Sequence, residues 1–127
     1  MVIASNVGNI SRVRLFLKEF FEEAKLDQAL FNKVYLGLSE AVTNSIVHGN
    51  QLNDSKDVRI SVDYLDSKII LEIADEGEGF STEVVFDPTT EENIKRESGR
   101  GIFLIRHFAD EVIYLEGGRK ILIKYRT

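Results

Sequence analysis

The sequence predicts an α+β protein: a two-layer α/β sandwich whose mixed, mainly antiparallel sheet is covered on one face by about three helices. Two observations lead to this prediction. Apolar residues recur at helical spacing up to about residue 50, and they alternate with polar residues in segments 58–64, 69–73, 112–115 and 120–125. Helix and strand patterns are thus grouped along the chain and do not follow a regular βαβ alternation.

The first helix is expected from about Ser5 to Ala24, and Asp27 is a suitable N-cap for a second helix that ends near Gly49-Asn50. The first helix has more large apolar side chains than one narrow face can bury. They are Val13, Phe16, Leu17, Phe20 and Phe21. A wide contact with the core and an exposed surface for a partner both account for this excess.

Two alternating strands, 58–64 and 69–73, are expected to pair through a turn at Asp66-Ser67. Residues 81–98 have little periodicity and are too long for a plain connection, which indicates a functional lid or a disordered segment. A third helix is expected from about Arg100-Gly101. The last two strands flank a hairpin turn at residues 116–119, and a short strand at residues 2–4 has weaker support.

The composition indicates one globular domain spanning residues 1–127, with a formal net charge of −5 and zero cysteines. A negative net charge does not favour direct binding to nucleic acid. The longest apolar runs fall short of the roughly 20 residues that a membrane span needs, so no membrane association is expected. The start of the chain does not follow the order of a secretory signal, and we expect a cytoplasmic protein.

Three polar residues recur at four-residue spacing on the expected second helix: Glu40, Asn44 and His48. A packed carboxylate, amide and imidazole require polar partners. Two later segments, DEGEGF (75–80) and SGRG (98–101), supply glycines that let backbone amides approach a phosphate-bearing ligand closely. The pattern therefore indicates a polar ligand site between this helix and two glycine segments.

Asp75 continues the parity of the buried strand residues Ile69, Leu71 and Ile73, so its carboxylate is aimed at the helix layer where the strand ends. A carboxylate in that place needs a hydrogen-bond donor. Taken alone, an aspartate capping a glycine turn is the simpler interpretation. The upstream polar stripe and the second glycine segment favour a ligand-binding role.

Together, EAVTNSIVHGN (40–50), DEGEGF and SGRG resemble the N, G1 and G2 boxes of the GHKL (Bergerat-fold) ATPase/kinase superfamily. Within it, the chain is most similar to the bacterial anti-sigma-factor serine/threonine-protein kinases of partner-switching systems. The resemblance extends from the first helix to the last hairpin. It implies the Bergerat ATP-binding fold and the cofactors ATP and Mg²⁺.

The resemblance also implies roles for individual residues. Glu40 matches the general base, Asn44 the magnesium ligand, and Asp75 the acceptor for the adenine amino group. His48 either lines the nucleotide pocket or bonds to neighbouring backbone. Two further groups complete the nucleotide site. Gly77 and Gly79 are the turn glycines, which are expected to adopt positive φ. The segment at the start of the third helix is expected to bind the phosphates, and it consists of Ser98, Gly99, Arg100 and Gly101.

Two positions depart from the family pattern. Phe103 stands where many members have a small residue, and Arg119 follows Gly118 where many have a threonine that reaches towards the adenine-binding aspartate. The second contact to the base is therefore in doubt. Neither departure affects Glu40, Asn44 or Asp75.

By this resemblance, the chain is expected to be an ATP-dependent protein-serine kinase that sequesters a sigma factor and phosphorylates a small antagonist protein on serine. It is also expected to form a homodimer. The alternative is a non-catalytic regulatory module that changes partners with its ATP or ADP state, and a third possibility is a scaffold without nucleotide. Retention of Glu40 favours the kinase, because a pure binder needs no base.

Overall fold

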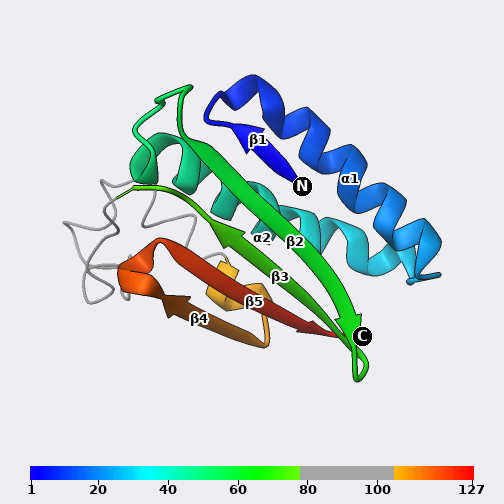
Figure 1. Ribbon diagram of the computed structural model, residues 1–127. Coiled ribbons are helices and arrows are strands. Elements are labelled where there is room, and N and C mark those ends of the chain that lie inside the picture. The colour runs from blue at the N-terminus through cyan, green and yellow to red at the C-terminus, as the bar shows by residue number, and fades with distance from the viewer. Residues whose placement is uncertain (78–104) are drawn as a thin grey trace.

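The computed structural model describes residues 1–77 and 105–127, which form a five-stranded sheet in the order β1-β2-β3-β5-β4 (Figure 1). Each strand pair in these two ranges is antiparallel. The strands are β1 (Val2–Ala4), β2 (Asp57–Leu65), β3 (Lys68–Ala74), β4 (Glu111–Leu115) and β5 (Lys120–Arg126). The predicted α+β sandwich is confirmed, including the short first strand.

Two long helices, α1 (Ile10–Glu23) and α2 (Phe31–Asn44), lie together on one face of the sheet, as Figure 1 shows. Residues 105–108 are also helical, and Ile105 is buried in the same apolar core. They fall within the expected third helix, whose expected start at Arg100-Gly101 lies outside the described residues. No helix in the described ranges is long and apolar enough to cross a bilayer.

The hairpin between β2 and β3 forms where the sequence predicts it. Leu65 pairs with Lys68, so the connection consists of Asp66 and Ser67, whose φ angles are 53° and 60°. Two consecutive left-handed residues are the conformation that matches the twist of paired strands. The second hairpin turns through Glu116–Gly118 between β4 and β5, again with positive φ. Both hairpins set the register of the strands that they join. Strand β3 ends at Ala74, directly before Asp75.

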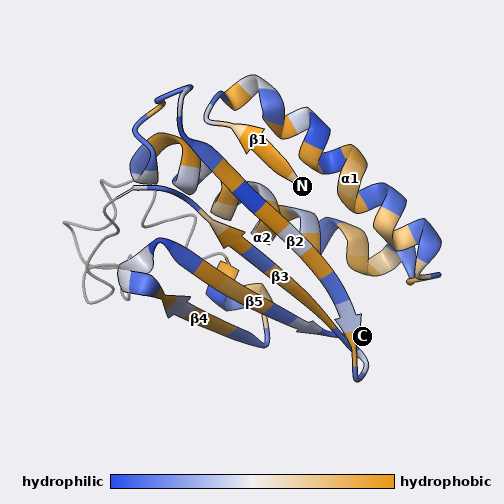
Figure 2. Ribbon diagram, viewed as in Figure 1, coloured by the Kyte–Doolittle hydropathy of each residue, from blue (hydrophilic) through white to orange (hydrophobic). Residues whose placement is uncertain are grey.

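The core lies between the sheet and the helices, and Figure 2 shows the apolar and polar residues alternating along the strands. Val13, Leu17 and Phe21 of α1 have no exposed surface. Phe16 and Phe20 are partly buried and pack against the core. The five large apolar side chains of α1 named above are therefore explained by a wide core contact, whereas Leu15 on the same helix is 57% exposed.

The starts of both helices differ from the sequence prediction in detail. A 3-10 turn, Val7–Asn9, precedes α1, and Asn6 caps this turn by accepting a hydrogen bond from the Gly8 amide. Asp27 likewise caps a 3-10 turn, Gln28–Leu30, that leads into α2. The capping residues thus begin short 3-10 segments, which continue into the α-helices.

The end of α2 differs more. Regular α-helix ends at Asn44, and a π-helical turn, Ser45–Gly49, follows, closed by a bond from the Asn50 amide to the Ser45 carbonyl at 2.8 Å. The chain then reverses through Gln51 and Leu52, whose φ angles are positive. The segment ends at Gly49-Asn50 as predicted, but Gly49 does not supply the left-handed residue.

Candidate functional site

Glu40 and Asn44 lie one α-turn apart on the last part of α2, and both are half-buried. His48 lies in the following π-helical turn and is exposed. The helical bonding therefore changes from α to π between Asn44 and His48. Glu40 and Asn44 are thus half-buried residues of α2, and His48 is an exposed residue of the π-turn.

Asp75 directly follows β3, whose residues Ile69, Leu71 and Ile73 have no exposed surface. Its carboxylate lies against the π-turn, where a side chain added at Gly49 would collide with both carboxylate oxygens. The Ser45 hydroxyl also bonds to this carboxylate. The strand parity therefore has the predicted consequence, because Asp75 faces the end of α2.

Gly77 is buried against the same π-turn. A side chain at Gly77 would collide with the Gly49 carbonyl, so the two glycines bring their backbones into direct contact. Positive φ was the expected reason for glycine here, and that expectation is wrong, because the residues with positive φ do not include Gly77. The physical requirement is close backbone approach.

Burial raises the pKa of the Asp75 carboxyl above its ordinary value of 3.8, while the Gly77 amide, the Ser45 hydroxyl and two nearby cations lower it. Burial has the largest effect, so the bonds from Gly77 and Ser45 do not fully replace the lost hydration. A half-buried carboxylate of this kind interacts favourably with a further donor, such as an amino group.

Three consecutive backbone amides hold the segment that carries this carboxylate. The Asp75 amide donates to the Arg119 carbonyl at 2.9 Å, and the Glu76 amide to Asn50 Oδ1 at 2.8 Å. The Gly77 amide donates to Asp75 Oδ1, also at 2.8 Å. The loop after β3 is thus fixed to Arg119 just before β5, to Asn50 just after the π-turn, and to its own Asp75.

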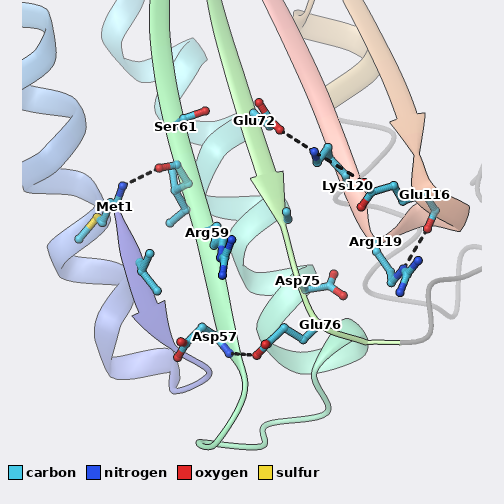
Figure 3. Close-up of a pocket in the computed structure, with 13 residues that line it drawn as sticks. Met1, Asp57, Arg59, Ser61, Glu72, Asp75, Glu76, Glu116, Arg119 and Lys120 are labelled. Carbon is cyan, nitrogen blue, oxygen red and sulfur yellow. Dashed lines mark hydrogen bonds and ion pairs between the residues drawn. The ribbon is translucent and has the colours of Figure 1, made fainter.

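The last hairpin contacts Asp75 through a backbone hydrogen bond, in which the Arg119 carbonyl accepts from the Asp75 amide. The Arg119 side chain is exposed, and its Nε donates to the Glu116 carbonyl at 3.1 Å (Figure 3). Its charge is one of the influences that lower the pKa of Asp75. Where the family pattern has a threonine contact, this chain therefore has a backbone bond and a nearby cation.

Asp75 and Glu76 border a hollow of about 650 Å³, and Figure 3 shows the residues that line it. Its lining includes outward-facing residues of β2, β3 and β5, among them Arg59, Glu72 and Lys120. Glu72 and Lys120 form an ion pair at 3.0 Å across it. The hollow is on the sheet face opposite the helices, so it is distinct from the expected cleft between α2 and the lid.

Several predicted site residues lie outside the described ranges: Gly79, Ser98, Gly99, Arg100 and Gly101, together with the departure at Phe103. Within residues 1–77 and 105–127, no group of three or more His, Cys, Asp or Glu side chains could hold a metal ion. A magnesium ion held by the Asn44 amide oxygen, phosphates and water does not need such a group. The oxygen chemistry of Asn44 therefore fits the expected ion.

For a purine nucleotide, the fit rests on Asp75, Gly49 and Gly77. A side chain at Gly49 would meet the Asp75 carboxylate, and one at Gly77 would meet the Gly49 carbonyl, so the two glycines pack closely around the carboxylate acceptor. An acceptor held at the edge of a closely packed backbone surface suits a flat base that carries an amino group.

Sequence reasoning missed three contributors to this site: Ser45, the steric role of Gly49, and Asn50. Ser45 and Gly49 continue the buried stripe of Leu38 and Val42. Small residues at the end of an apolar stripe were a usable signal of close approach. Asn50 gave no such signal, because its partners are 7 to 45 residues away in the sequence.

Comparison with known proteins defines the class. Residues 3–125 match the family described as histidine kinase-like ATPase domain, and the chain belongs to this family. It is 31% identical to the serine-protein kinase RsbW of Staphylococcus aureus strain MSSA476, over 98% of this chain and 84% of the relative. The RsbW of strain JH9 matches to the same extent.

Among solved structures, the chain is similar to a histidine kinase domain from the Erythrobacter litoralis EL346 blue-light activated histidine kinase. The TM-score is 0.49 and the sequence identity 18%, over 74% of this chain and 42% of that one.

Proposed function

We propose that this chain is an ATP-dependent protein-serine kinase that also acts as an anti-sigma factor, sequestering a sigma factor and phosphorylating a small antagonist protein on serine. The serine-protein kinases that match nearly the whole chain support the reaction class. The sigma factor and the antagonist follow from the resemblance to partner-switching kinases. A cytoplasmic homodimer that regulates transcription is part of the same proposal.

The observation that carries the proposal is the position of the Asp75 carboxylate. Its carboxylate lies against two glycines in backbone contact, at the end of the helical segment that bears Glu40 and Asn44. Asp75 would accept a hydrogen bond from the adenine amino group, and Gly77 would lie under the base. Ser45 would hold the carboxylate in place.

Glu40 would take the proton from the attacking serine hydroxyl, and Asn44 would hold Mg²⁺. Bound ATP would supply the γ-phosphoryl group, with Mg²⁺ neutralising its phosphate charge. The phosphate contacts are proposed for Ser98, Gly99, Arg100 and Gly101, and Gly79 is proposed to lie with Gly77 in the turn under the base. His48, which is exposed in the π-turn, would line the pocket or bond to neighbouring backbone.

Glu40→Gln tests the reaction. The amide keeps the size of the side chain but removes its basicity, so phosphoryl transfer to a serine-bearing antagonist should fall by ~10²-fold or more. Nucleotide affinity should be retained. The control is Glu19→Gln on the exposed side of α1, which makes the same chemical change away from the site.

The outcomes separate the kinase from the regulatory module. If Glu40→Gln transfers phosphate as fast as the wild type and as Glu19→Gln, Glu40 is not the base. If the wild type binds Mg-ATP but transfers no phosphate to any candidate antagonist, the non-catalytic module that changes partners with nucleotide state replaces the kinase. Labelled ATP with purified candidate partners gives both readouts.

A further inference from the structure

Asn50 is a polar side chain with no exposed surface, at the junction of three segments. Its Nδ2 donates to Ser5 Oγ at 2.8 Å and to the Asp57 carbonyl at 2.9 Å. Its Oδ1 accepts from the Glu76 amide at 2.8 Å. The side chain therefore connects the end of the helical segment to the first strand region, to β2 and to the loop after β3.

The orientation of this amide is fixed by its partners. A rotated amide would place Nδ2 against the Glu76 N–H and Oδ1 against the Asp57 carbonyl, and both contacts would be repulsive. Both Nδ2 hydrogens and one lone pair of Oδ1 are in use. Such a saturated buried network holds one arrangement strongly, because each broken bond leaves a buried polar group without a partner.

The bond to Glu76 is the part that bears on the nucleotide site. Glu76 lies between Asp75 and Gly77. Among the amides of residues 75–77, that of Glu76 is the one that donates to the side chain of Asn50. Its carboxylate also accepts from the Asp57 amide at 2.6 Å, which holds the same residue from the other side. A shift of Glu76 would move the carboxylate before it and the glycine after it.

We propose that Asn50 is a positioning residue for base recognition: it fixes the Glu76 main chain against the end of the helical segment and so holds Asp75 where an adenine amino group can reach it. This inference rests on the proposed role of Asp75 in nucleotide binding. Asn50 itself does not touch the base. It acts through the backbone of residues 75–77, whose other two amides bond to Arg119 and to Asp75 itself.

The test compares Asn50→Ala with Ser5→Ala in the full chain. Ser5 is 1% exposed and belongs to the same network, but its loss leaves the bond between Asn50 and Glu76 intact. The probes are Mg-ATP and Mg-ITP, measured by calorimetric titration. ITP carries an oxygen in place of the adenine amino group, so a carboxylate acceptor should discriminate against it.

In the wild type, ATP should bind more tightly than ITP. Asn50→Ala should lower this preference ~10-fold, a loss on the scale of a hydrogen bond with its unpaired partner. Ser5→Ala should lower the thermal stability but keep the wild-type preference. Hydrogen exchange at the Glu76 amide should be slow in the wild type and in Ser5→Ala, and fast in Asn50→Ala.

An unchanged preference in Asn50→Ala, or an equal loss in Ser5→Ala, would overturn the positioning role while leaving the proposed function in place. A wild type that does not prefer ATP would instead refute the role of Asp75, and this inference with it. If Asn50→Ala does not fold, hydrogen exchange in the wild type tests the proposal. A Glu76 amide that exchanges as fast as an unprotected amide would rule out the positioning role of Asn50.

Discussion

The carboxylate of Asp75 occupies the space that a side chain at Gly49 would fill. These residues are 26 positions apart, one in the π-turn after α2 and the other at the end of β3. Their contact joins the helix that carries Glu40 and Asn44 to the loop that would read the base. The position of the acceptor is therefore set by the absence of a side chain at Gly49.

Gly49→Ala should displace Asp75. Gly49 does not have positive φ, so alanine is compatible with its backbone and the effect is steric. Forcing a methyl group into this contact should lower the free energy of unfolding by about 1–3 kcal/mol and reduce the stabilisation by Mg-ATP. Urea denaturation with and without nucleotide measures both quantities.

Gly117→Ala is the matched control for that change. Gly117 has a φ of 68° and no atom within 4 Å of an added Cβ, so its substitution strains the backbone without a collision. It should lower stability by about 1 kcal/mol and leave the nucleotide-induced gain unchanged. If Gly49→Ala also kept the full gain, the position of the Asp75 carboxylate would not matter for binding.

Asp75→Asn should raise the stability of the protein without nucleotide at pH 7. Because burial raises the pKa of the Asp75 carboxyl, its contribution to stability is fully present below the unfolded value of 3.8 and is lost as the pH rises through the folded value. Asparagine is uncharged throughout this range, and its Oδ1 can still accept the Gly77 amide.

The advantage of Asp75→Asn should therefore shrink as the pH is lowered towards 3.8. Urea denaturation of both proteins at a series of pH values, without nucleotide, gives the curve. Asp63→Asn, on an exposed position of β2, controls for the change in net charge. A wild type that is more stable than Asp75→Asn at pH 7 would show that the carboxylate is well compensated in the fold.

Much of the fold was readable from local patterns. The alternation in residues 58–64 and 69–73 fixes two strands and the face that each side chain takes, and the same parity carries through to Asp75. Asp66-Ser67 was readable because a short polar turn between two alternating strands has few possible conformations. These features depend on residues close together in the sequence.

The rest depended on contacts between distant segments. Glycine is required at position 77 because the Gly49 backbone approaches it closely, and this contact is not visible in the sequence. The sequence-based prediction that Gly77 adopts positive φ is wrong for that reason. The π-turn that separates His48 from Asn44 has no periodic signature. Asn50 reads as a helix-ending residue, while its buried network with Ser5, Asp57 and Glu76 becomes visible only when these segments are assembled.

A second close approach, between α2 and β5, allows a test of packing away from the site. A side chain at Gly37 would collide with the Tyr125 hydroxyl, which is buried and has no hydrogen-bond partner among the described residues. Burial also raises the pKa of Tyr125, so the hydroxyl stays protonated. Gly37→Ala should cost about 1–3 kcal/mol through overpacking.

Tyr125→Phe should be neutral or stabilising by up to about 1 kcal/mol, because it removes a buried hydroxyl without a bond. In the Gly37→Ala background it should recover much of the lost stability. A double-mutant cycle by urea denaturation measures this coupling. Tyr64→Phe, at an exposed hydroxyl near Thr127, is the control. Additive effects of Gly37→Ala and Tyr125→Phe would contradict the collision.

The central claim is that a purine nucleotide binds with its amino group on the Asp75 carboxylate. The most direct test is the thermal shift of the full chain with saturating Mg-ATP, compared between the wild type and Asp75→Asn. For the wild type, the shift should correspond to a rise of roughly 2–4 kcal/mol in the free energy of unfolding, and Asp75→Asn should lose most of that rise. An equal shift in both proteins, or no shift in the wild type, would contradict the account.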